Sequence, residues 1–545
     1  MRIDLIDKKN ILPALVVFFF FCTYILVGYL IYKDYGVSAD EPVDYLRGQV
    51  DFKRFSGGSL EQFQKDCAMM DNESICYYPP LFSMLLYRIA PYGDNLPVVM
   101  RGRSWYGPSG NTQSIYLHRH QVTFAYFVFS VFIFFLIGKK IFKDWKIGLL
   151  GSLFLIISPR IFAQSFFNPK DIPFLSTYVI SIYTMLLFLE KKNVFTAILH
   201  GIAIGILCSI RTPGLIIIPI TLFFYLFDLF LSREKWKSYF KACLLLLITL
   251  IIAAGLVYLF TPVLYTNPIA NFINAFNIMK QYPWNNFQLY MGKNIKGTVP
   301  WHYSLVWFAI SSPVFYILLF LLGEVILIIR TVKSRTRDHF RSMRDIYLVG
   351  ACGVLPIGAV ILMKSTLYNS NRQMYFVYPA LLLVSLYGFK YLIEKIRPKI
   401  LRWQLWTAII LVAGLAYPVY FIVRYHPYEY VYFNFLAGPS MSVVKENYEL
   451  DGWGVSVRDG LEYILKTDSS SRINVTLFDG QPQGYYLLPL IDRGRLRINS
   501  DSDLPSYILT TYRSYPNKIV TEGKIYYSIK VGDTAILTIY KLPKK

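Results

Sequence analysis

The sequence is poor in cysteine, histidine and charged residues, and each shortage narrows the class of protein. Six cysteines and six histidines among 545 residues include no group with the spacing of a zinc site. Charged residues make up only 17% of the chain, whereas 54% is hydrophobic and the mean hydropathy is +0.39. Soluble domains and disordered chains do not have this composition. The composition is that of a membrane protein.

Long apolar blocks are abundant, and several are long enough to span a membrane. A helix that crosses the hydrocarbon layer needs about 20 apolar residues, since its backbone must satisfy its own hydrogen bonds. The first block exceeds the apolar core of a signal peptide and has no small-residue cleavage site after it, so we expect a retained helix. About eleven spans are expected in all, near residues 11–32, 120–138, 147–160, 172–189, 194–210, 213–231, 242–261, 304–329, 346–363, 374–389 and 405–423.

Acidic residues are also few, with 34 Asp and Glu against 56 Lys and Arg. The excess of basic residues is unevenly distributed along the chain. Alternate short connections are strongly basic: 139–146, 191–192, 233–241, 330–344 and 390–402. With Arg2, Lys8 and Lys9, roughly 24 basic residues fall on one side and roughly 8 in the short loops opposite. The positive-inside rule therefore places the N-terminus in the cytoplasm, in what we expect to be a bacterial inner membrane. Topology accounts for the charge, so no nucleic-acid partner is expected.

An odd number of spans divides the chain into two expected domains. Residues 1–423 form a transmembrane domain with a long outward loop at 33–119, and residues 424–545 form a periplasmic C-terminal domain. Helix-like residues 455–465 precede alternating stretches at 473–478, 507–510 and 535–540, which are typical of strands. The predicted fold class is therefore a polytopic α-helical membrane protein with a small soluble α/β domain.

Cys67 and Cys76 are set apart from the other four cysteines, which lie in apolar spans and act as small hydrophobic side chains. The two are nine residues apart in the outward loop, where oxidation is possible. We predict a disulfide that staples this loop.

The acidic pair Asp40-Glu41 stands where the chain leaves the first span, and Pro42 follows it. One interpretation is the ordinary preference for acidic residues at the start of a helix. The other is catalytic: a carboxylate near the headgroups could remove a proton from an acceptor hydroxyl or amine while a sugar leaves a lipid phosphate. The pair alone does not decide between them.

Other outward loops supply groups that suit a phosphate. Asp171, Lys170, Arg160, Arg211 and Arg372 fall at the outer ends of spans, on the side of Asp40. Arginine and lysine can hold a leaving phosphate, although each of them could equally be a residue anchored at the headgroups.

Histidines and aromatic residues add candidates for substrate binding. His118, Arg119 and His120 could supply a cation or a proton donor near the site, or they could form a cluster in the membrane interface. The two histidines are two positions apart and so lie on different faces of a helix, which argues against a metal site. The loop 261–303 carries Tyr282, Trp284, Trp301 and His302, which could stack on sugars or anchor the loop in the interface.

Several short motifs together resemble the family 39 glycosyltransferases. That group includes protein O-mannosyltransferases and bacterial aminoarabinose lipid A transferases, all with the GT-C fold. The later motifs resemble bacterial members more than eukaryotic enzymes. The motifs are Asp40-Glu41 after the first span, and residues 158–163, 168–174, 267–268, 282–284, 372–379, 426–434 and 449–454.

This resemblance implies an inverting transfer of a hexose or pentose from a polyprenyl-phosphate sugar, with neither metal nor cofactor. It gives Asp40 the role of base, with Glu41 beside it, and makes Asp171 the second acidic position. Arg372 is the first choice for the donor phosphate, followed by Lys170, Arg211 and Arg119. The implied partners are the lipid-linked donor, a lipid, glycan or protein acceptor, and membrane lipids. Asn369 and Asn371 depart from the acidic and aromatic residues expected there.

Three alternatives stay open. A transporter or flippase of lipid-linked sugars would also have many spans, but ionisable residues are scarce within the spans and gather at their outer ends. An O-antigen polymerase or ligase would use loop arginines without an Asp-Glu pair. An inactive scaffold that binds lipid-linked sugars is the third.

Overall fold

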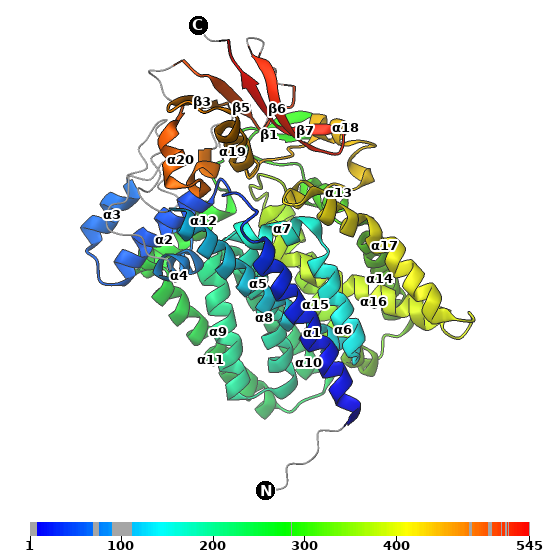
Figure 1. The fold of residues 1–545 in the computed structure, drawn as a ribbon. Helices are drawn as coiled ribbons and strands as arrows, with labels where there is room; N and C mark the ends of the chain where they lie inside the picture. Colours follow the sequence, from blue (N-terminus) through cyan, green and yellow to red (C-terminus); the bar gives the residue numbers. More distant parts are fainter. Residues whose placement is uncertain are drawn as a thin grey trace.

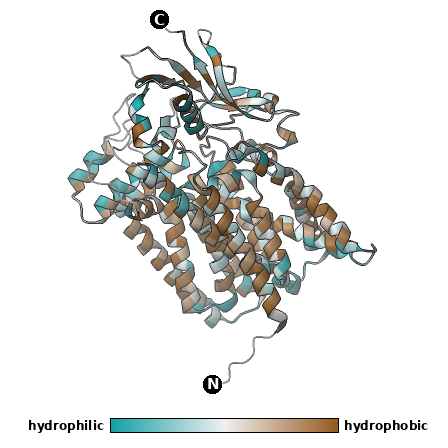
Figure 2. Ribbon diagram, in the orientation of Figure 1, coloured by the Kyte–Doolittle hydropathy of each residue, from teal (hydrophilic) through white to brown (hydrophobic). Residues whose placement is uncertain are grey.

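The computed structural model describes residues 8–68, 76–89, 112–284, 286–478, 482–499, 504–513, 515–517, 520 and 523–543. A bundle of apolar helices forms one end of the molecule, and the C-terminal region covers the other end (Figure 1). Apolar residues dominate the bundle, whereas polar residues gather at its two ends and in the C-terminal region (Figure 2). The predicted fold class is therefore confirmed.

Each predicted span overlaps one helix of the bundle in position. In the described part of the chain, nine apolar stretches are long enough to cross a membrane, or ten if the bent pair α6 and α7 counts as one. The remaining predicted span is α9, which has 17 residues. The bundle helices are α1 (Lys8–Ile31), α5 (Thr112–Phe142), α6 (Trp145–Ile156), α8 (Asp171–Lys191), α9 (Val194–Ile210), α10 (Ile217–Leu231), α11 (Trp236–Phe260), α14 (Val314–Lys333), α15 (Arg337–Leu362), α16 (Tyr378–Ile396) and α17 (Trp403–Tyr425).

One predicted span is interrupted. The sequence predicts a continuous helix over 304–329, but the structure has α13 (Tyr303–Ser311) and then α14, separated at Ser312-Pro313. Proline lacks an N–H and disfavours helical geometry in the residue before it, and Ser312 accordingly has an extended ψ of 150°. A similar Ser158-Pro159 step bends α7 (Pro159–Phe167) away from α6 by 71°.

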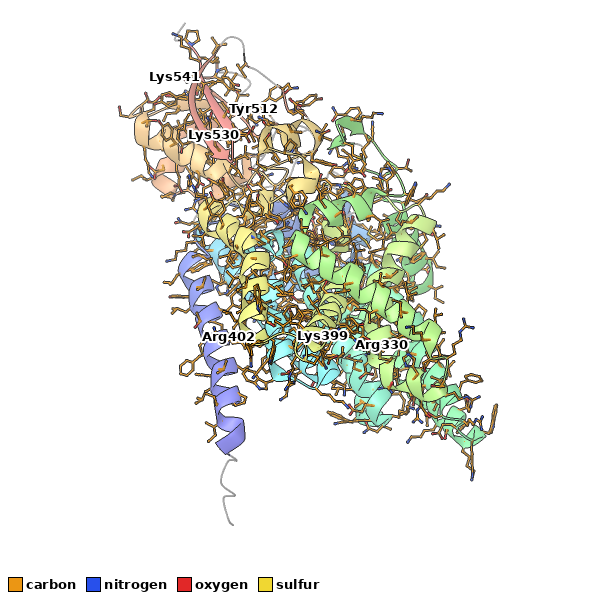
Figure 3. The ribbon with its side chains drawn as sticks, turned by 90° about the vertical axis from the view of Figure 1, so that its right-hand side faces the viewer. Arg330, Lys399, Arg402, Tyr512, Lys530 and Lys541 are labelled. Carbon is orange, nitrogen blue, oxygen red and sulfur yellow. A yellow bond between two sulfur atoms is a disulfide. The ribbon has the colours of Figure 1, made fainter. Side chains whose placement is uncertain are left out.

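Short elements cap the end of the bundle that faces the C-terminal region, which we call the capped end. They come from connections that the sequence places on the side of Asp40 and from the adjoining ends of predicted spans. They are α2 (Glu41–Phe55), α3 (Leu60–Ala68), α4 (Leu81–Ile89), α7, η2 (Thr212–Ile216), η3 (Pro262–Tyr265), α12 (Pro268–Lys280), β1 (Gln288–Tyr290), β2 (Lys293–Ile295), α13 and η4 (Arg372–Val377). Basic residues of the opposite loops, such as Arg330, Lys399 and Arg402, lie far from the C-terminal Lys530 and Lys541 (Figure 3).

The C-terminal region is built on a five-stranded sheet of order β4-β3-β5-β7-β6. β3 is parallel to β4 and β5, whereas β7 is antiparallel to β5 and β6. Gly460 of α19 lies against Leu509 and Leu537, so a larger residue there would crowd the sheet. The elements are η5 (Glu429–Val431), η6 (Phe435–Ala437), α18 (Met441–Asn447), α19 (Val457–Thr467), β3 (Ile473–Leu477), η7 (Pro482–Leu487), α20 (Leu490–Arg495), β4 (Leu496–Ile498), β5 (Tyr507–Thr510), β6 (Lys524–Val531) and β7 (Thr534–Lys541).

Buried contacts fix the C-terminal region on the bundle. Thr112 at the start of α5 donates a hydrogen bond of 2.7 Å to the carbonyl of Tyr486, and Arg493 donates one of 2.7 Å to the Thr112 hydroxyl. The rings of Tyr116 and Tyr486 stack at 5.6 Å. The region is therefore seated directly above the loops that carry the candidate site.

Candidate active site

Asp40 is held at the first turn of α2 by backbone contacts on both sides. The N–H of Ala39 donates to the carbonyl of Trp453 at 3.0 Å, and Pro42 fixes the start of the helix. The Asp40 side chain caps no N–H of α2. Its Oδ2 instead accepts a hydrogen bond of 2.5 Å from Nη1 of Arg372.

Arg372 connects Asp40 to a second carboxylate. Its Nη1 lies 3.5 Å from Oδ2 of Asp171, and Arg211 forms an ion pair with the other Asp171 oxygen. The guanidinium also lies over the rings of Tyr368 and Trp453, at 5.2 and 4.7 Å. Residues from three predicted outward loops and the C-terminal region thus meet around one buried arginine.

A polar cavity of about 170 Å³ opens beside this cluster. It contains carboxylates from α2 and cations from the neighbouring loops, so charges of both signs face one space. Its lining comprises Asp40, Val43, Asp44, Arg47, Tyr78, Pro79, Pro80, Phe82, Ser83, Pro169, Lys170, Ile210, Tyr282, Trp284, Tyr368 and Arg372.

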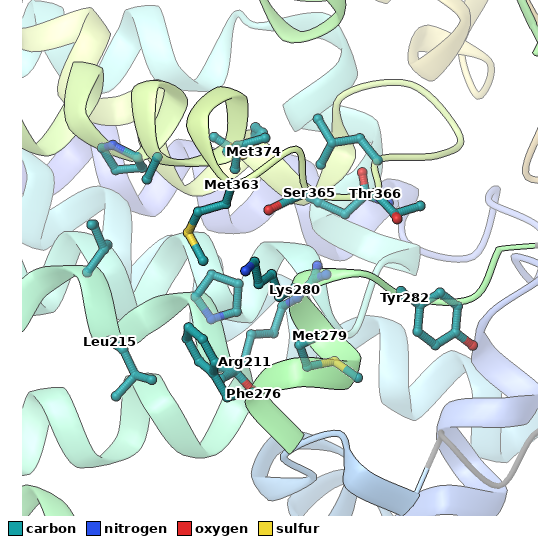
Figure 4. Close-up of a pocket in the computed structure, with 18 of the residues that line it drawn as sticks. Arg211, Leu215, Phe276, Met279, Lys280, Tyr282, Met363, Ser365, Thr366 and Met374 are labelled. Carbon is teal, nitrogen blue, oxygen red and sulfur yellow. The ribbon is translucent and has the colours of Figure 1, made fainter. Parts of the chain in front are cut away.

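An apolar cavity of about 300 Å³ adjoins the polar one and shares Tyr78, Tyr282 and Tyr368 with it. η2, α12, α15 and η4 form its walls, with apolar side chains such as Phe276, Met279 and Met363 (Figure 4). Arg211 and Lys280 are its two basic lining residues, and its described lining includes no acid. The two cavities therefore lie next to each other, and one is apolar whereas the other is lined by charged residues.

The two carboxylates of the polar cavity have opposite electrostatic environments. Burial raises the pKa of Asp40, but the charges of Arg372 and Lys170 outweigh it and lower that pKa to about 2. Burial raises the pKa of Asp44, and the negative charges of Asp40 and Asp171 raise it further. Asp40 is therefore ionised at any physiological pH, whereas Asp44 holds its proton more readily.

Glu41 faces away from the cavity. Its carboxylate accepts hydrogen bonds from the Ser38 N–H at 2.7 Å and the Ser38 hydroxyl at 3.1 Å, and it lies 3.0 Å from Nε2 of His120. Successive helical residues point about 100° apart, so two neighbouring acids cannot share one direction. The pair seen in the sequence is split between the cavity and the bundle.

The predicted cluster His118-Arg119-His120 lies next to α2. Arg119 is 1% exposed and its guanidinium is 5.6 Å from the ring of Tyr45, with no hydrogen bond in the part of the chain that is described. His120 pairs with Glu41, and His118 is half-buried. None of the three lines either cavity.

The aromatic candidates fall into two groups. Tyr282 and Trp284 line the polar cavity, where the Trp284 ring stacks on Tyr368 at 4.1 Å. Trp301 is 68% exposed, and Nδ1 of His302 lies 2.8 Å from the hydroxyl of Tyr290 in β1. Trp301 and His302 lie outside the lining of both cavities.

Some residues of the site were not singled out from the sequence, among them Asp44, Lys280 and Arg513. Asp44 lies four residues after Asp40, a spacing that places both on one face of α2 and that could have indicated it. Lys280, at the C-terminus of the amphipathic α12, gave only a weak signal. Arg513, whose charge contributes to lowering the pKa of Asp40, comes from the C-terminal region and no local pattern marks it.

Two further features bear on the chemistry. A disulfide joins Cys67 at the end of α3 to Cys76, the pairing that the sequence predicts, shortly before Tyr78 enters the cavity. Within the described residues, no group of three or more His, Cys, Asp and Glu side chains is placed to hold a metal ion.

One segment of the chain is similar to a known family. Residues 118–259 match the family described as dolichyl-phosphate-mannose-protein mannosyltransferase. The resemblance to these glycosyltransferases is therefore confirmed. The matched segment contains Asp171 and Arg211 but neither Asp40 nor Arg372.

Solved structures give similarities of low identity. ArnT from Cupriavidus metallidurans in the apo state is 12% identical with a TM-score of 0.46, over 96% of this chain and 98% of that one. The same enzyme bound to undecaprenyl phosphate gives 12% and 0.46, over 97% and 98%. An apo oligosaccharyltransferase from Archaeoglobus fulgidus gives 12% and 0.46, over 88% of this chain and 64% of that one. The search of curated proteins found no match.

Proposed function

We propose that this protein transfers a sugar from a polyprenyl-phosphate carrier to an acceptor at the capped end of the bundle. The transfer inverts the anomeric centre and uses neither metal nor cofactor. In this proposal the capped end faces the periplasm of a bacterial inner membrane, and the acceptor is a lipid, a glycan or a protein. The confirmed resemblance to a glycosyltransferase family over residues 118–259 supports the reaction class.

The observation that carries the proposal is that an apolar cavity and a charged cavity adjoin and share three tyrosines. A polyprenyl-phosphate sugar is apolar along its chain and polar at its head, and the two adjoining cavities offer one apolar and one charged space. The isoprenoid chain suits the walls of η2, α12 and α15, where burying each CH₂ contributes about 0.8 kcal/mol. The sugar and its phosphate then reach the space beside Asp40 and Asp44.

The balance of charges around the two cavities favours a departing phosphate. Five basic residues line the two cavities against the two acids Asp40 and Asp44; the basic residues are Arg47, Lys170, Arg211, Lys280 and Arg372. A sugar-linked phosphate diester carries one negative charge, and the monoester left after transfer carries up to two, because its second pKa is about 6. Cations fixed beside the cavities therefore stabilise the departing group more than the bound donor, which lowers the barrier.

The aromatic wall provides a surface for the sugar. Trp284 and Tyr282 face the polar cavity, and the stacking of Trp284 on Tyr368 holds its ring in place. Flat rings of this kind pack against the C–H faces of a pyranose. A carboxylate of the cavity accepts the proton that the acceptor loses, and Asp40 and Asp44 are the two carboxylates that line it.

The test is mass spectrometry of envelope glycolipids, glycans and glycoproteins from cells that lack the gene, with and without a plasmid copy. We expect one glycosyl increment that disappears on deletion and returns with the wild-type protein. Purified protein should also bind undecaprenyl phosphate. Translocation of a lipid-linked sugar in vesicles, without any glycoside product, would support a flippase instead and overturn the proposal.

A further inference from the structure

Asp40 and Asp44 lie one turn apart on the same face of α2, and both line the polar cavity. Their partners differ. Oδ2 of Asp40 accepts the 2.5 Å hydrogen bond from Arg372, which also lies 3.5 Å from Asp171. Asp40 is therefore committed to holding a cation, and a carboxylate held in this way is a weak base.

Asp44 is paired with a cation much less closely than Asp40. Its nearest cation is Lys170, with 3.6 Å between Nζ and Oδ1, which is longer than a hydrogen bond. Its Oδ2 has no hydrogen-bond partner in the described part of the chain, although the residue is only 5% exposed. A buried carboxylate oxygen left without a donor costs free energy, and the cost is larger when the group is charged. Such a group gains by accepting a proton.

We propose that Asp44 is the proton acceptor of the transfer reaction, and that Asp40 is a positioning residue that holds Arg372. This inference rests on the proposed function and departs from the family resemblance, which gives the role of base to Asp40. In the step, a lone pair of the acceptor oxygen or nitrogen forms the bond to the anomeric carbon. The bond from that carbon to the phosphate oxygen breaks, and its electron pair stays on the phosphate. The acceptor proton moves to the Asp44 carboxylate, which becomes a carboxylic acid.

The charged groups around Asp44 are consistent with this role. Asp40 faces it from its own helix, Arg119 from α5, Lys170 from the residue before α8, and Asp171 from the first turn of α8, while Arg47 and Arg372 line the same cavity. The cavity wall from α4 consists of Phe82 and Ser83, which carry no charge. Burial and the two acids raise the pKa of Asp44, and the two cations lower it. A general base works best when its pKa approaches the working pH, so the raised value favours Asp44 over Asp40.

The experiment compares Asp44→Asn, Asp44→Ala, Asp40→Asn and Asp40→Ala, with Glu61→Gln as the control. Glu61 is an exposed carboxylate on α3. Each purified protein is added to membranes from deletion cells, and the initial rate of the glycosyl increment is measured. We expect Asp44→Asn to lose at least about 100-fold in rate, the usual share of a general base. Its binding of undecaprenyl phosphate and its melting temperature should match the wild type.

Two further readouts separate a base from a structural residue. Formate should restore transfer by Asp44→Ala, because a small carboxylate can occupy the vacated space, and it should not restore Asp40→Ala. The negative charge of Asp40 raises the pKa of Asp44, so its removal in Asp40→Asn should lower that pKa. The acidic limb of the pH–rate profile of Asp40→Asn should therefore lie at lower pH than that of the wild type.

Near wild-type transfer by Asp44→Asn would overturn the inference, as would formate rescue of Asp40→Ala alone. In either case the wild-type protein still makes the product, so the proposed function survives. If wild-type protein adds no sugar and releases no undecaprenyl phosphate from these membranes, the proposed function itself fails.

Discussion

Nη2 of Arg513, beyond strand β5, donates a hydrogen bond of 3.0 Å to Oδ1 of Asn369 in the loop before Arg372. Asn369 and the adjacent Ser370 have left-handed backbones, with φ of 53° and 69°. Such residues cost of order 1–3 kcal/mol each and persist only where neighbouring contacts hold them. The C-terminal region therefore helps to hold the turn that presents Arg372 to Asp40. The departure of Asn369 from the family pattern has a physical role here, since its amide accepts this bond.

Arg513→Ala should reduce sugar transfer about tenfold, because a charge-assisted hydrogen bond contributes about 1.5 kcal/mol and 1.4 kcal/mol corresponds to a factor of ten. The measurement is the initial rate of the glycosyl increment in membranes from deletion cells. Arg497→Ala is the matched control, because Arg497 is exposed on the same region and, within the described residues, donates its hydrogen bonds to nearby carbonyls. Equal rates for the two variants would show that the turn does not depend on Arg513.

Arg372→Ala should lower the melting temperature of the protein as well as its transfer rate. Removal of the guanidinium leaves Asp40 and the buried Asp171 without this shared cation, and breaking a buried ion pair costs about 3–5 kcal/mol. Adding Asp40→Asn should recover part of the lost stability, since one of the two stranded charges disappears. Thermal unfolding in detergent measures both variants. A double variant no more stable than Arg372→Ala would contradict the shared ion pair.

Lys280→Ala should weaken the binding of undecaprenyl phosphate about fivefold, because about 1 kcal/mol of charge-assisted attraction to the phosphate is lost. The loss should shrink at high salt, since solvent ions screen a partly exposed charge. Lys293→Ala in the exposed strand β2 is the control. The readout is a titration of purified protein with the lipid at low and high salt. Affinity unchanged at both salt concentrations would remove Lys280 from the phosphate site.

Protonation of His426 should stabilise the junction between α17 and the C-terminal region. Burial lowers the pKa of His426, but its contacts with Glu429 and Asp34, at 2.6 and 2.9 Å, prevail and raise it to about 9. A raised folded-state pKa gives stability that is complete below the unfolded value of about 6.5 and is lost as the pH rises through 9.

The melting temperature of the wild type should therefore fall between pH 6.5 and 9 more steeply than that of His426→Gln. His339→Gln, at the opposite end of the bundle, is the control and should keep the wild-type slope. Parallel curves for the wild type and His426→Gln would show that this histidine does not carry the effect.

The spans could be predicted because about twenty apolar residues in succession are typical of a membrane-spanning helix. The break at Ser312-Pro313 was missed because a single proline hardly changes the mean hydropathy of a window. The meeting of Asp40, Asp171 and Arg372 was also foreseeable, since one side of the membrane gathers its loops. The directions of side chains were not. Because Asp40 and Glu41 are adjacent in the sequence, they were expected to act together, whereas the helix directs Glu41 toward His120. Arg513 lies 144 residues from Asn369, so the contact depends on how the sheet sits on the bundle.

The ion pair between Asp40 and Arg372 spans 332 positions of the chain. A ribosome makes Asp40 first, then Asp171, and reaches Arg372 only after most of the apolar helices have been synthesised. Until then the two carboxylates lack the cation that they share. A chain truncated or stalled before Arg372 thus holds a site that lacks its central arginine.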